Sequence, residues 1–565
     1  HGRGGSPYLS APAYGFVGEN SVVGAGLPIA DGIALAAQVR GTDGVTLVSF
    51  GDGATNQGAA HEALVLAAAR NLPVVFVCEN NGWSEMTPIS ATARIERLAL
   101  RAPGYGMPGA TIDGNDPDAV AAAVADAVAR ARAGEGPTFL ECRTARLLGH
   151  YNLDIEHYRP QEDRDAAREA DPIPAVRRTL VDLEIATAEA LDDVAAEVEA
   201  AVEAARRRAL SAPPPDPAGA RAHVVAEHRS SGPRRASSVG RQELSYALAV
   251  NLALKLELEE RPEVVVFGED IAVPGGVFGV TRNLQKEFGA TRVFDTPIAE
   301  AAILGAAVGA SMEGLRPVAE IMWADFLLVA LDQLVNQAAN VRYLSSGRVS
   351  APLVVRCQQG VTPGSCAQHS QSLEALLAHI PGLRVGLPAT PQDAYSMLRA
   401  AIADPDPVIL IESRALYNDK GVVDPELVPD AIGGARTVRE GGDVSIVSWG
   451  RMVHRAEEAA RELAERGIEA EVIDLRWLAP LDIEAVSRSV AKTSRVLVVH
   501  EANQTGGFGG ELVSRIVETS FESLDAPPVR VATPDVRFPA APVLQNALLP
   551  SADAIVAAAA QLAGD

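Results

Sequence analysis

The chain of 565 residues carries a formal net charge of −24, and aromatic residues make up only 4% of it. This acidity excludes a broad electrostatic surface for nucleic acid or for an anionic membrane. We find no run of about 18 apolar residues and no signal peptide, so we expect no membrane span and no membrane partner. The length suffices for roughly three or four domains, each with its own hydrophobic core.

The four cysteines show no metal-binding spacing and occupy positions Cys78, Cys142, Cys357 and Cys366. The first three lie in apolar, strand-like runs, which predicts buried thiols. Free thiols of this kind are typical of a reducing compartment, so we expect a cytoplasmic protein.

Alternating strand-like and helix-like stretches from residue 1 to about 165 predict a doubly wound α/β domain. The stretch from about 172 to 210 predicts helices. A proline-rich run at 212–217 and a polar, basic stretch at 229–238 predict a linker. A second α/β domain is expected from about 239 to 415, and a third from near Asp443 to the end.

The first domain contains a candidate site for a metal and a phosphate. A strand-like run at 45–50 precedes Gly51-Asp52-Gly53, and a second run at 73–78 leads to Asn80-Asn81. The stretch between them, 56–70, predicts a helix. Polar groups therefore lie at the carboxyl ends of two strands, where open α/β sheets hold ligands.

The residue types at this site suit one kind of ligand. A carboxylate oxygen from Asp52 and an amide oxygen from Asn81 are ligands that Mg²⁺ accepts while it shares phosphate oxygens. Gly53 lets backbone N–H groups approach a diphosphate at a helix start. The pattern predicts a Mg²⁺–diphosphate site.

This unit is similar to the motif of thiamine-diphosphate-dependent enzymes. The surrounding sequence resembles the α subunit of 2-oxo acid dehydrogenase E1 components of the pyruvate and acetoin type, in the strings 2–6 (GRGGS), 22–24 (VVG), 51–58 (GDGATNQG), 79–82 (ENNG) and 143–150 (RTARLLGH). From about residue 238 the chain resembles the β subunit, in the strings 267–270 (FGED), 275–278 (GGVF), 294–300 (FDTPIAE), 368–374 (QHSQSLE) and 505–509 (TGGFG). The resemblance covers nearly the whole chain.

The resemblance implies two doubly wound thiamine-diphosphate-binding domains and a C-terminal transketolase-type α/β domain. We predict an E1 α-like diphosphate-binding domain at 1–210, a linker at 211–238, an E1 β-like pyrimidine-binding domain at 239–430 and a transketolase C-terminal-like domain at 431–565. The family pairs as α₂β₂, so we expect a homodimer of the fused chain. Whether each site forms within one chain or across two is left open, as are a monovalent cation site and contacts from a segment before His1.

The resemblance also implies site residues. For Mg²⁺ these are Asp52, Asn81 and the backbone carbonyl of Trp83. For thiamine diphosphate they are Ser21, Val23, Asp52, Gly53, Ala54, Asn81, Arg146, Glu300 and Trp323. For Arg146, a solvent-exposed ion pair stays an alternative.

Three residues match catalytic positions of the family. Glu300 matches the carboxyl group beside N1′ of the aminopyrimidine, where a strong hydrogen bond favours the imino tautomer that deprotonates C2. His150 and His369 match histidines at the mouth of the site, which handle protons and guide the incoming carrier. An ordinary structural role for these two histidines stays an alternative.

The resemblance implies an enzyme that forms a hydroxyalkyl–cofactor carbanion from a 2-oxo acid. It transfers the acyl unit to a lipoyl-type group on a separate lipoylated E2-like or acyl-carrier protein. Departures from the family pattern cluster near the substrate, at Pro7-Tyr8, 151–159, Gln358-Gln359, 362–366 and Trp323. They favour, as an alternative, transketolase-like transfer of a two-carbon ketol unit from a ketose phosphate. A non-catalytic scaffold is a further alternative.

Gly506-Gly-Phe-Gly-Gly510 follows a strand-like run and precedes a helix, but its spacing differs from GxGxxG. We predict a tight strand-to-helix turn there and no nucleotide site.

Overall fold

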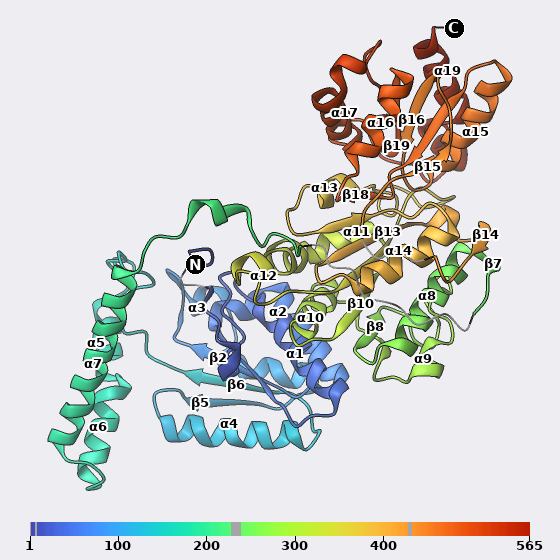
Figure 1. Cartoon of the computed structure of the whole chain (residues 1–565). Coiled ribbons are helices and arrows are strands. Elements are labelled where there is room, and N and C mark those ends of the chain that lie inside the picture. Colours follow the sequence, from blue (N-terminus) through green and yellow to red (C-terminus); the bar gives the residue numbers. More distant parts are fainter. Residues whose placement is uncertain (1, 6–7, 228–238, 428–431, 565) are drawn as a thin grey trace. The chain divides into compact units, whose positions relative to one another are not determined.

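The computed structural model describes residues 2–5, 8–227, 239–427 and 432–564 (Figure 1). The chain divides into two compact units, His1–Ala222 (unit 1) and His223–Asp565 (unit 2). Ser6 and Pro7 of the predicted motifs lie outside the described residues. The same holds for 228–238 of the predicted linker and for 428–431, which span a predicted domain boundary.

Unit 1 alternates strands and helices, as the sequence predicts. Its elements are η2 (Pro12–Tyr14), α1 (Gly26–Arg40), β1 (Thr46–Gly51), η3 (Asp52–Asn56), α2 (Gly58–Arg70), β2 (Val74–Asn80), β3 (Trp83–Ser84), β4 (Thr87–Pro88), α3 (Ile89–Thr92), η4 (Leu98–Tyr105), β5 (Gly109–Asp113), α4 (Pro117–Arg132), β6 (Thr138–Arg143), α5 (Gln161–Glu169), α6 (Pro172–Asp182), α7 (Ala188–Ser211) and η5 (Pro217–Arg221).

A four-stranded parallel sheet with the order β1-β2-β6-β5 forms the centre of unit 1. Helix α4 covers one face, and α1 and α2 cover the other (Figure 1). Because all strands run in the same direction, the carboxyl ends of β1, β2 and β6 lie along one edge. Asp52, Asn81 and Arg146 follow these three ends.

One predicted helix boundary is wrong. The helix expected over 56–70 begins at Gly58, because η3 occupies Asp52–Asn56 as a 3₁₀ turn. The Thr55 hydroxyl donates to the Asp52 carbonyl at 2.7 Å inside this turn, and the backbone of Gln57 is extended. The turn keeps Asp52 at the sheet edge.

Unit 2 contains the remaining elements. Up to residue 423 they are β7 (Gln242–Ser245), α8 (Tyr246–Glu260), β8 (Val264–Gly268), α9 (Leu284–Phe288), β9 (Val293–Asp295), α10 (Glu300–Met312), β10 (Arg316–Ile321), α11 (Ala324–Leu327), η6 (Leu328–Ala330), η7 (Asp332–Ala338), α12 (Ala339–Leu344), β11 (Val354–Gln359), α13 (Glu374–Ala378), β12 (Arg384–Gly386), α14 (Pro391–Ala403), β13 (Val408–Ser413), η8 (Arg414–Leu416) and β14 (Lys420–Val423).

A seven-stranded sheet with the order β18-β12-β13-β11-β10-β8-β9 runs through this part. Strands β8, β11 and β13 are almost fully buried, which is typical of parallel strands covered on both faces, although only β8 is apolar throughout. Helices α8 and α14 pack together on one face, and the almost fully buried α10 packs on β10 from the other.

The C-terminal part forms a second sheet. Its elements are β15 (Arg436–Arg439), β16 (Val444–Ser448), α15 (Met452–Glu465), β17 (Ala470–Asp474), β18 (Trp477–Ala479), α16 (Ile483–Thr493), β19 (Val496–Asn503), α17 (Phe508–Ser520), η9 (Phe521–Ser523), β20 (Val529–Thr533), α18 (Pro542–Leu548) and α19 (Ala552–Ala563). Five strands pair in the order β15-β17-β16-β19-β20, whereas β18 pairs antiparallel with β12. The glycine-rich string at 506–510 joins β19 to α17 as a turn, as predicted.

By length and composition alone, the stretch Pro542–Ala563 could cross a membrane. In the structure this stretch is two helices, α18 and α19, rather than one continuous span. The apolar face of α19, with Ile555 and Val556, lies in the core of the C-terminal domain against α15. That face is therefore covered by the domain itself.

Candidate active site

Asp52 is the central residue of the sheet edge in unit 1. Only 1% of it is exposed, and its Oδ2 atom has no hydrogen-bond partner within the described residues. Burial raises the pKa of this carboxyl group, whereas the nearby charge of Arg146 lowers it. An unpartnered buried carboxylate oxygen is unfavourable, and a bound cation would satisfy it.

Two successive asparagines form the turn after β2. The Oδ1 atom of Asn80 accepts the N–H of Gly82 at 3.1 Å, and Oδ1 of Asn81 accepts the N–H of Trp83 at 3.0 Å. Asn80 also donates to the buried carboxylate of Glu141 at 2.6 Å. Asn80 therefore anchors the turn, and the amide oxygen of Asn81 keeps a second lone pair for a cation.

The turn that carries Trp83 packs on the start of η3. A Cβ atom added at Gly53 would overlap the hydroxyl of Ser84, so only glycine fits there. The short strands β3 and β4 form the hairpin that holds this contact. The backbone around Trp83 thus lies beside Asp52, as a carbonyl ligand would require, and Trp83 as a metal ligand stays a prediction.

Ser21 and Val23 belong to the turn before α1. The Ser21 hydroxyl shares a hydrogen bond of 2.7 Å with the Tyr8 hydroxyl, and Val23 is exposed. Gly24, with a φ of 86°, packs against Gln57, where a Cβ atom would lie 2.9 Å from the Gln57 Cβ. The turn lies against the link between η3 and α2, where Ala54 is buried.

Arg146 lies on the loop after β6, only 8% of its side chain is exposed, and it forms a buried ion pair with Asp154; its contact with a diphosphate stays a prediction. Its Nε atom donates to the Leu148 carbonyl at 3.2 Å and its Nη1 atom to the Glu85 carbonyl. The buried Nη2 atom lies 3.8 Å from the Asp154 carboxylate and makes no hydrogen bond. One buried N–H group of Arg146 is therefore free to meet an anion.

Asp154 organises the loop after His150. Its carboxylate accepts the Tyr158 hydroxyl at 2.6 Å and the backbone N–H groups of His150 at 2.7 Å and Glu156 at 2.9 Å. These hydrogen bonds, that of Tyr158 foremost, lower the pKa of Asp154 to about 2. The Tyr158 ring contacts Trp83 at 5.4 Å between centroids. The loop thus fixes the His150 backbone next to the Trp83 turn.

In unit 2, five side chains follow the carboxyl ends of parallel strands. Glu269 follows β8, Glu300 begins α10 after β9, and Trp323 follows β10. His369 lies on the loop after β11, and Arg414 follows β13. Because the strands are parallel neighbours, these residues gather at one edge of the sheet.

Glu269 lies close to Glu300. Burial raises the pKa of Glu269 to about 7, and the charges of Glu300 and Asp270 add to this effect. The sequence analysis quoted Glu269 within a matching string but assigned it no role. Its position directly after the buried apolar strand β8 is the signal that could have identified it.

Trp323 is surrounded by rings and by one cation. Its ring meets Phe278 at 5.4 Å and His369 at 5.0 Å between centroids, both edge-on. The guanidinium carbon of Arg414 lies over it, 3.7 Å from the ring centre. The structure therefore brings the predicted residues Trp323 and His369 into contact.

His369 has further neighbours on its own loop. Phe326 meets its ring at 5.4 Å, and the Cys366 sulfur lies 3.9 Å from its Nδ1 atom. Its carbonyl accepts a hydrogen bond of 2.8 Å from Arg414. The sequence analysis missed Arg414, because only the fold brings it to His369.

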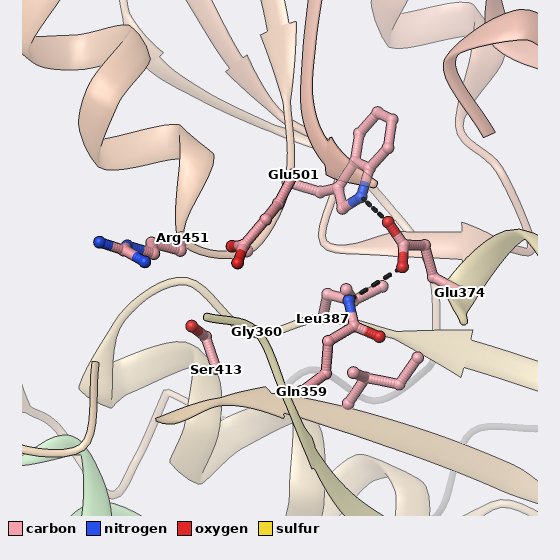
Figure 2. Close-up of a pocket in the computed structure, with 10 residues that line it drawn as sticks. Gln359, Gly360, Glu374, Leu387, Ser413, Arg451 and Glu501 are labelled. Atoms are coloured by element: carbon pink, nitrogen blue, oxygen red, sulfur yellow. Dashed lines mark hydrogen bonds between the residues drawn. The ribbon is translucent and has the colours of Figure 1, made fainter. Parts of the chain in front are cut away.

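A pocket of about 330 Å³, part of it open to solvent, lies behind this loop (Figure 2). Glu501 accepts the N–H of Val361 at 2.8 Å, and Glu374 accepts from Gln359 at 2.9 Å and from Trp449 at 3.3 Å. Burial raises the pKa of both glutamates. None of the predicted catalytic residues lines this pocket, so we assign it to the support of the loop rather than to substrate.

Within the described ranges, no group of three or more histidine, cysteine, aspartate or glutamate residues could hold a metal ion. A cation at Asp52 would therefore depend on amide, carbonyl and phosphate oxygens. That donor set suits Mg²⁺ rather than a transition metal.

Residues 1–218 match the family described as "Dehydrogenase E1 component". Residues 242–420 match the pyrimidine-binding domain of transketolase, and residues 433–555 match the transketolase C-terminal domain. The β subunit of acetoin:2,6-dichlorophenolindophenol oxidoreductase from Bacillus subtilis (strain 168) is 42% identical, over 57% of this chain and 98% of the relative. The chain belongs to the E1 family of thiamine-diphosphate-dependent 2-oxo acid dehydrogenases.

Other E1 relatives carry different substrate names. The β subunit of pyruvate dehydrogenase E1 from Leifsonia xyli is 45% identical over 56% of this chain and 93% of the relative. The β subunit of 2-oxoisovalerate dehydrogenase from Bacillus subtilis is 42% identical over 57% and 98%. Similar identities to acetoin, pyruvate and 2-oxoisovalerate enzymes leave the donor of this E1 chain undecided.

A solved structure of a transketolase variant from Pichia stipitis has a TM-score of 0.64 at 17% identity, covering 97% of this chain and 82% of that one. This likeness concerns the fold. The predicted membership of the E1 family is confirmed. An E1 α-like region precedes a β-like region in one chain, and the protein is an enzyme of the thiamine-diphosphate-dependent E1 family.

Proposed function

We propose that this E1 enzyme takes a 2-oxo acid as donor and passes the resulting acyl unit to a lipoyl-type group on a separate carrier protein. The observation that carries the proposal is the buried Asp52 carboxylate, whose unpartnered oxygen lies at the same sheet edge as Asn81. It supports the metal and diphosphate end of the cofactor site. The carboxyl and imidazole groups of unit 2 support the chemistry.

In unit 1, we propose that Asp52, the Asn81 amide and the Trp83 carbonyl bind Mg²⁺. The free Nη2 group of Arg146 would donate to a diphosphate oxygen, because it is buried and has no other hydrogen bond. The backbone at Gly53 has room for a diphosphate because no side chain stands there. The negative Asp52 carboxylate would thus face the cation, and the positive Arg146 guanidinium would face the diphosphate.

When bound, thiamine diphosphate would supply a nucleophilic carbon that attacks the donor carbonyl. Glu300 would hold a proton at the pyrimidine nitrogen through a hydrogen bond, which strengthens in a site that excludes water. Glu269, whose pKa burial and the charge of Glu300 raise to about 7, would hold or release a proton near neutral pH beside Glu300.

His150 and His369 would act on the donor oxygen and on the incoming dithiolane. His369 lies edge-on to Trp323, which places its ring beside a predicted cofactor contact. The side chain of His150 is half exposed, and its Nε2 atom lies 3.7 Å from a Glu85 carboxylate oxygen. That geometry suits a group at the mouth of a site, since a proton can exchange with solvent there.

For assembly and location, we propose a homodimer in a reducing cytoplasm. The family pairing described above motivates the dimer, and the four free cysteines are consistent with the location. Light scattering of the active protein tests the assembly, and a fully active monomer would contradict it.

The second candidate is transfer of a two-carbon ketol unit from a ketose phosphate. The observation that favours it is the loop 151–159, which carries substrate-side departures and is tied to Arg146 through Asp154. Leu153 and Ile155 on this loop are 82% and 79% exposed, where serine-rich sequences are usual in the pyruvate branch. A changed loop at this place supports a changed donor.

One experiment separates the two candidates. The holoenzyme is incubated with a panel of 2-oxo acids and, separately, with ketose phosphates, and the cofactor adduct is identified by mass spectrometry. Carbon dioxide release with a 2-oxo acid supports decarboxylation, and a two-carbon adduct without carbon dioxide supports ketol transfer. Free product released at full rate without any carrier would contradict transfer to a lipoyl-type group.

A further inference from the structure

We propose that Arg414 is a positioning residue that closes the loop carrying His369 and fixes this loop against Trp323. Arg414 is buried, its hydrogen bonds within the described residues go to two backbone carbonyls, and the carboxylates of Asp325 and Glu501 act on it only through their charge. A buried guanidinium without an ion pair is costly, and burial lowers the pKa of Arg414 to about 10. The contacts that offset this cost are those with the carbonyls of Gly360 and His369 and with the Trp323 ring.

The hydrogen bonds of Arg414 join the two ends of the loop. Its Nη2 atom donates to the carbonyl of Gly360 at 2.6 Å, directly after β11, and to the carbonyl of His369 at 2.8 Å. One nitrogen thus bridges the start of the loop and the catalytic candidate at its far end. Such charge-assisted bonds to carbonyls are stronger than neutral ones.

The flat face of the guanidinium makes the second contact. It lies 3.7 Å from the centre of the Trp323 ring, well inside the range of a cation–π contact. His369 touches the same ring edge-on at 5.0 Å. Arg414 therefore fixes His369 from both sides, through its backbone and through the ring on which its imidazole packs.

The other side of the loop is held by the C-terminal domain. Glu501 accepts the N–H of Val361 at 2.8 Å, and Arg451 donates to the Val361 carbonyl at 3.1 Å. Gln545 donates to the Thr362 carbonyl at 3.1 Å. These contacts hold the first residues of the loop, whereas Arg414 bonds to the carbonyl of His369, and Asp325 holds the neighbouring Gln371.

Cys366 gives a readout of loop closure that does not depend on activity. It lies on the loop, and it is partly accessible, whereas Cys78, Cys142 and Cys357 are buried. In apo-protein, the rate of its reaction with a disulfide reagent reports how often the loop opens. Cys366→Ser identifies the signal.

Arg414→Met should accelerate labelling of Cys366 by roughly tenfold or more, because the loss of both charged hydrogen bonds frees the His369 end. Arg414→Lys should give a smaller increase, because an ammonium can bond one carbonyl but does not stack flat on indole. The matched control is Arg316→Met. Arg316 also donates to backbone carbonyls, those of Ile402 at 2.6 Å and Asp404 at 3.0 Å, but at the opposite end of β10.

The control variant should leave the labelling rate within about twofold of wild type. Wild-type labelling in Arg414→Met, or equal acceleration in Arg414→Met and Arg316→Met, would overturn the proposal. Failure of both Arg414 variants to fold would overturn it as well, since the guanidinium would then support the whole unit rather than the loop.

The effect on acyl transfer rests on the proposed function, whereas the labelling result does not. If Arg414 acts through His369, adding Arg414→Met to the wild-type protein should slow single-turnover transfer by about tenfold. Adding it to the His369→Ala variant should slow transfer by less than about twofold. Additive losses would contradict a positioning role. If wild-type enzyme acylates no carrier, the proposed function fails, and the labelling rates still decide whether Arg414 closes the loop.

Discussion

In unit 1, the oxygens of Asn80 and Asn81 accept N–H groups only two residues further along the chain. In unit 2, the loop of His369 is held by Arg414, 45 residues away, and by Glu501, 140 residues from its partner Val361. The turn proposed to hold the metal is thus shaped by short-range hydrogen bonds with one distant anchor from Asn80 to Glu141, whereas the loop of His369 is held by contacts between distant residues. Short-range contacts re-form easily, whereas the loop depends on the integrity of unit 2.

The largest effect expected from this comparison between the turn of unit 1 and the loop of unit 2 is at Asp52. Asp52→Ala should abolish Mg²⁺-dependent binding of thiamine diphosphate, with affinity reduced at least about 100-fold, because the carboxylate is the charged ligand of the proposed cation. Calorimetric titration of apo-protein with cofactor and Mg²⁺ measures this. Asp31→Asn is the control, since it alters another buried carboxyl group without hydrogen-bond partners in unit 1 and should leave the affinity unchanged. Unchanged affinity in Asp52→Ala would remove it from the site.

The next effect concerns Glu300. Glu300→Gln keeps the size of the side chain but removes the carboxyl group, so proton exchange at the cofactor C2 should slow by about 10²–10⁴-fold. Cofactor affinity should stay within about tenfold, because the proposed metal and diphosphate contacts come from unit 1. Hydrogen–deuterium exchange followed by rapid acid quench measures the step. A normal exchange rate in the variant would exclude this role.

His369→Ala should impair transfer to a carrier by about 10–100-fold while adduct formation changes less, because the histidine is proposed to serve the incoming dithiolane. Single-turnover acylation of candidate carriers, followed by intact-protein mass, separates the two steps. Gln368→Ala, a change at an exposed neighbour, is the control. Equal losses in both steps would move His369 from acceptor chemistry to donor chemistry.

The smallest effect is a pH dependence at Glu269. Its pKa is raised from 4.5 to about 7 in the folded protein, so the native state binds this proton more tightly than the unfolded chain does. Stability is therefore lost as pH rises from about 4.5 through 7, and a half-buried group at this shift contributes about 1 kcal/mol after screening. Urea unfolding of apo-protein should show Glu269→Gln more stable than wild type by this amount at pH 8 and equal to it near pH 4.5. A difference that does not vary with pH would contradict the raised pKa.

The sequence predicted the α/β class, and the polar residues that follow strands in unit 1, because both depend on local patterns. Strand runs and the Asp52 and Asn81 positions are visible in short windows of residues. The expected start of α2, at Asn56, was two residues too early, because the 3₁₀ turn that contains Asn56 and the extended backbone of Gln57 leave no mark in the sequence.

The role of Arg414 could not be predicted from the sequence. Its three contacts lie directly after β11, on the loop before α13 and after β10, so no short window of sequence contains them. Glu269 was hidden for a different reason. Its raised pKa comes from burial and from Glu300, which is a neighbour only through the pairing of β8 with β9.

Strand β18 has a consequence for how the chain can be divided. It comes from the C-terminal part of the chain, yet it pairs antiparallel with β12 at the edge of the seven-stranded sheet. A protein shortened near residue 432, between the two transketolase-type regions, would leave the backbone of β12 open to pairing with other molecules. Such a fragment should aggregate, whereas a fragment that ends after β18 would keep this edge covered. The boundary between the sequence families is thus not a boundary at which the protein can be cut.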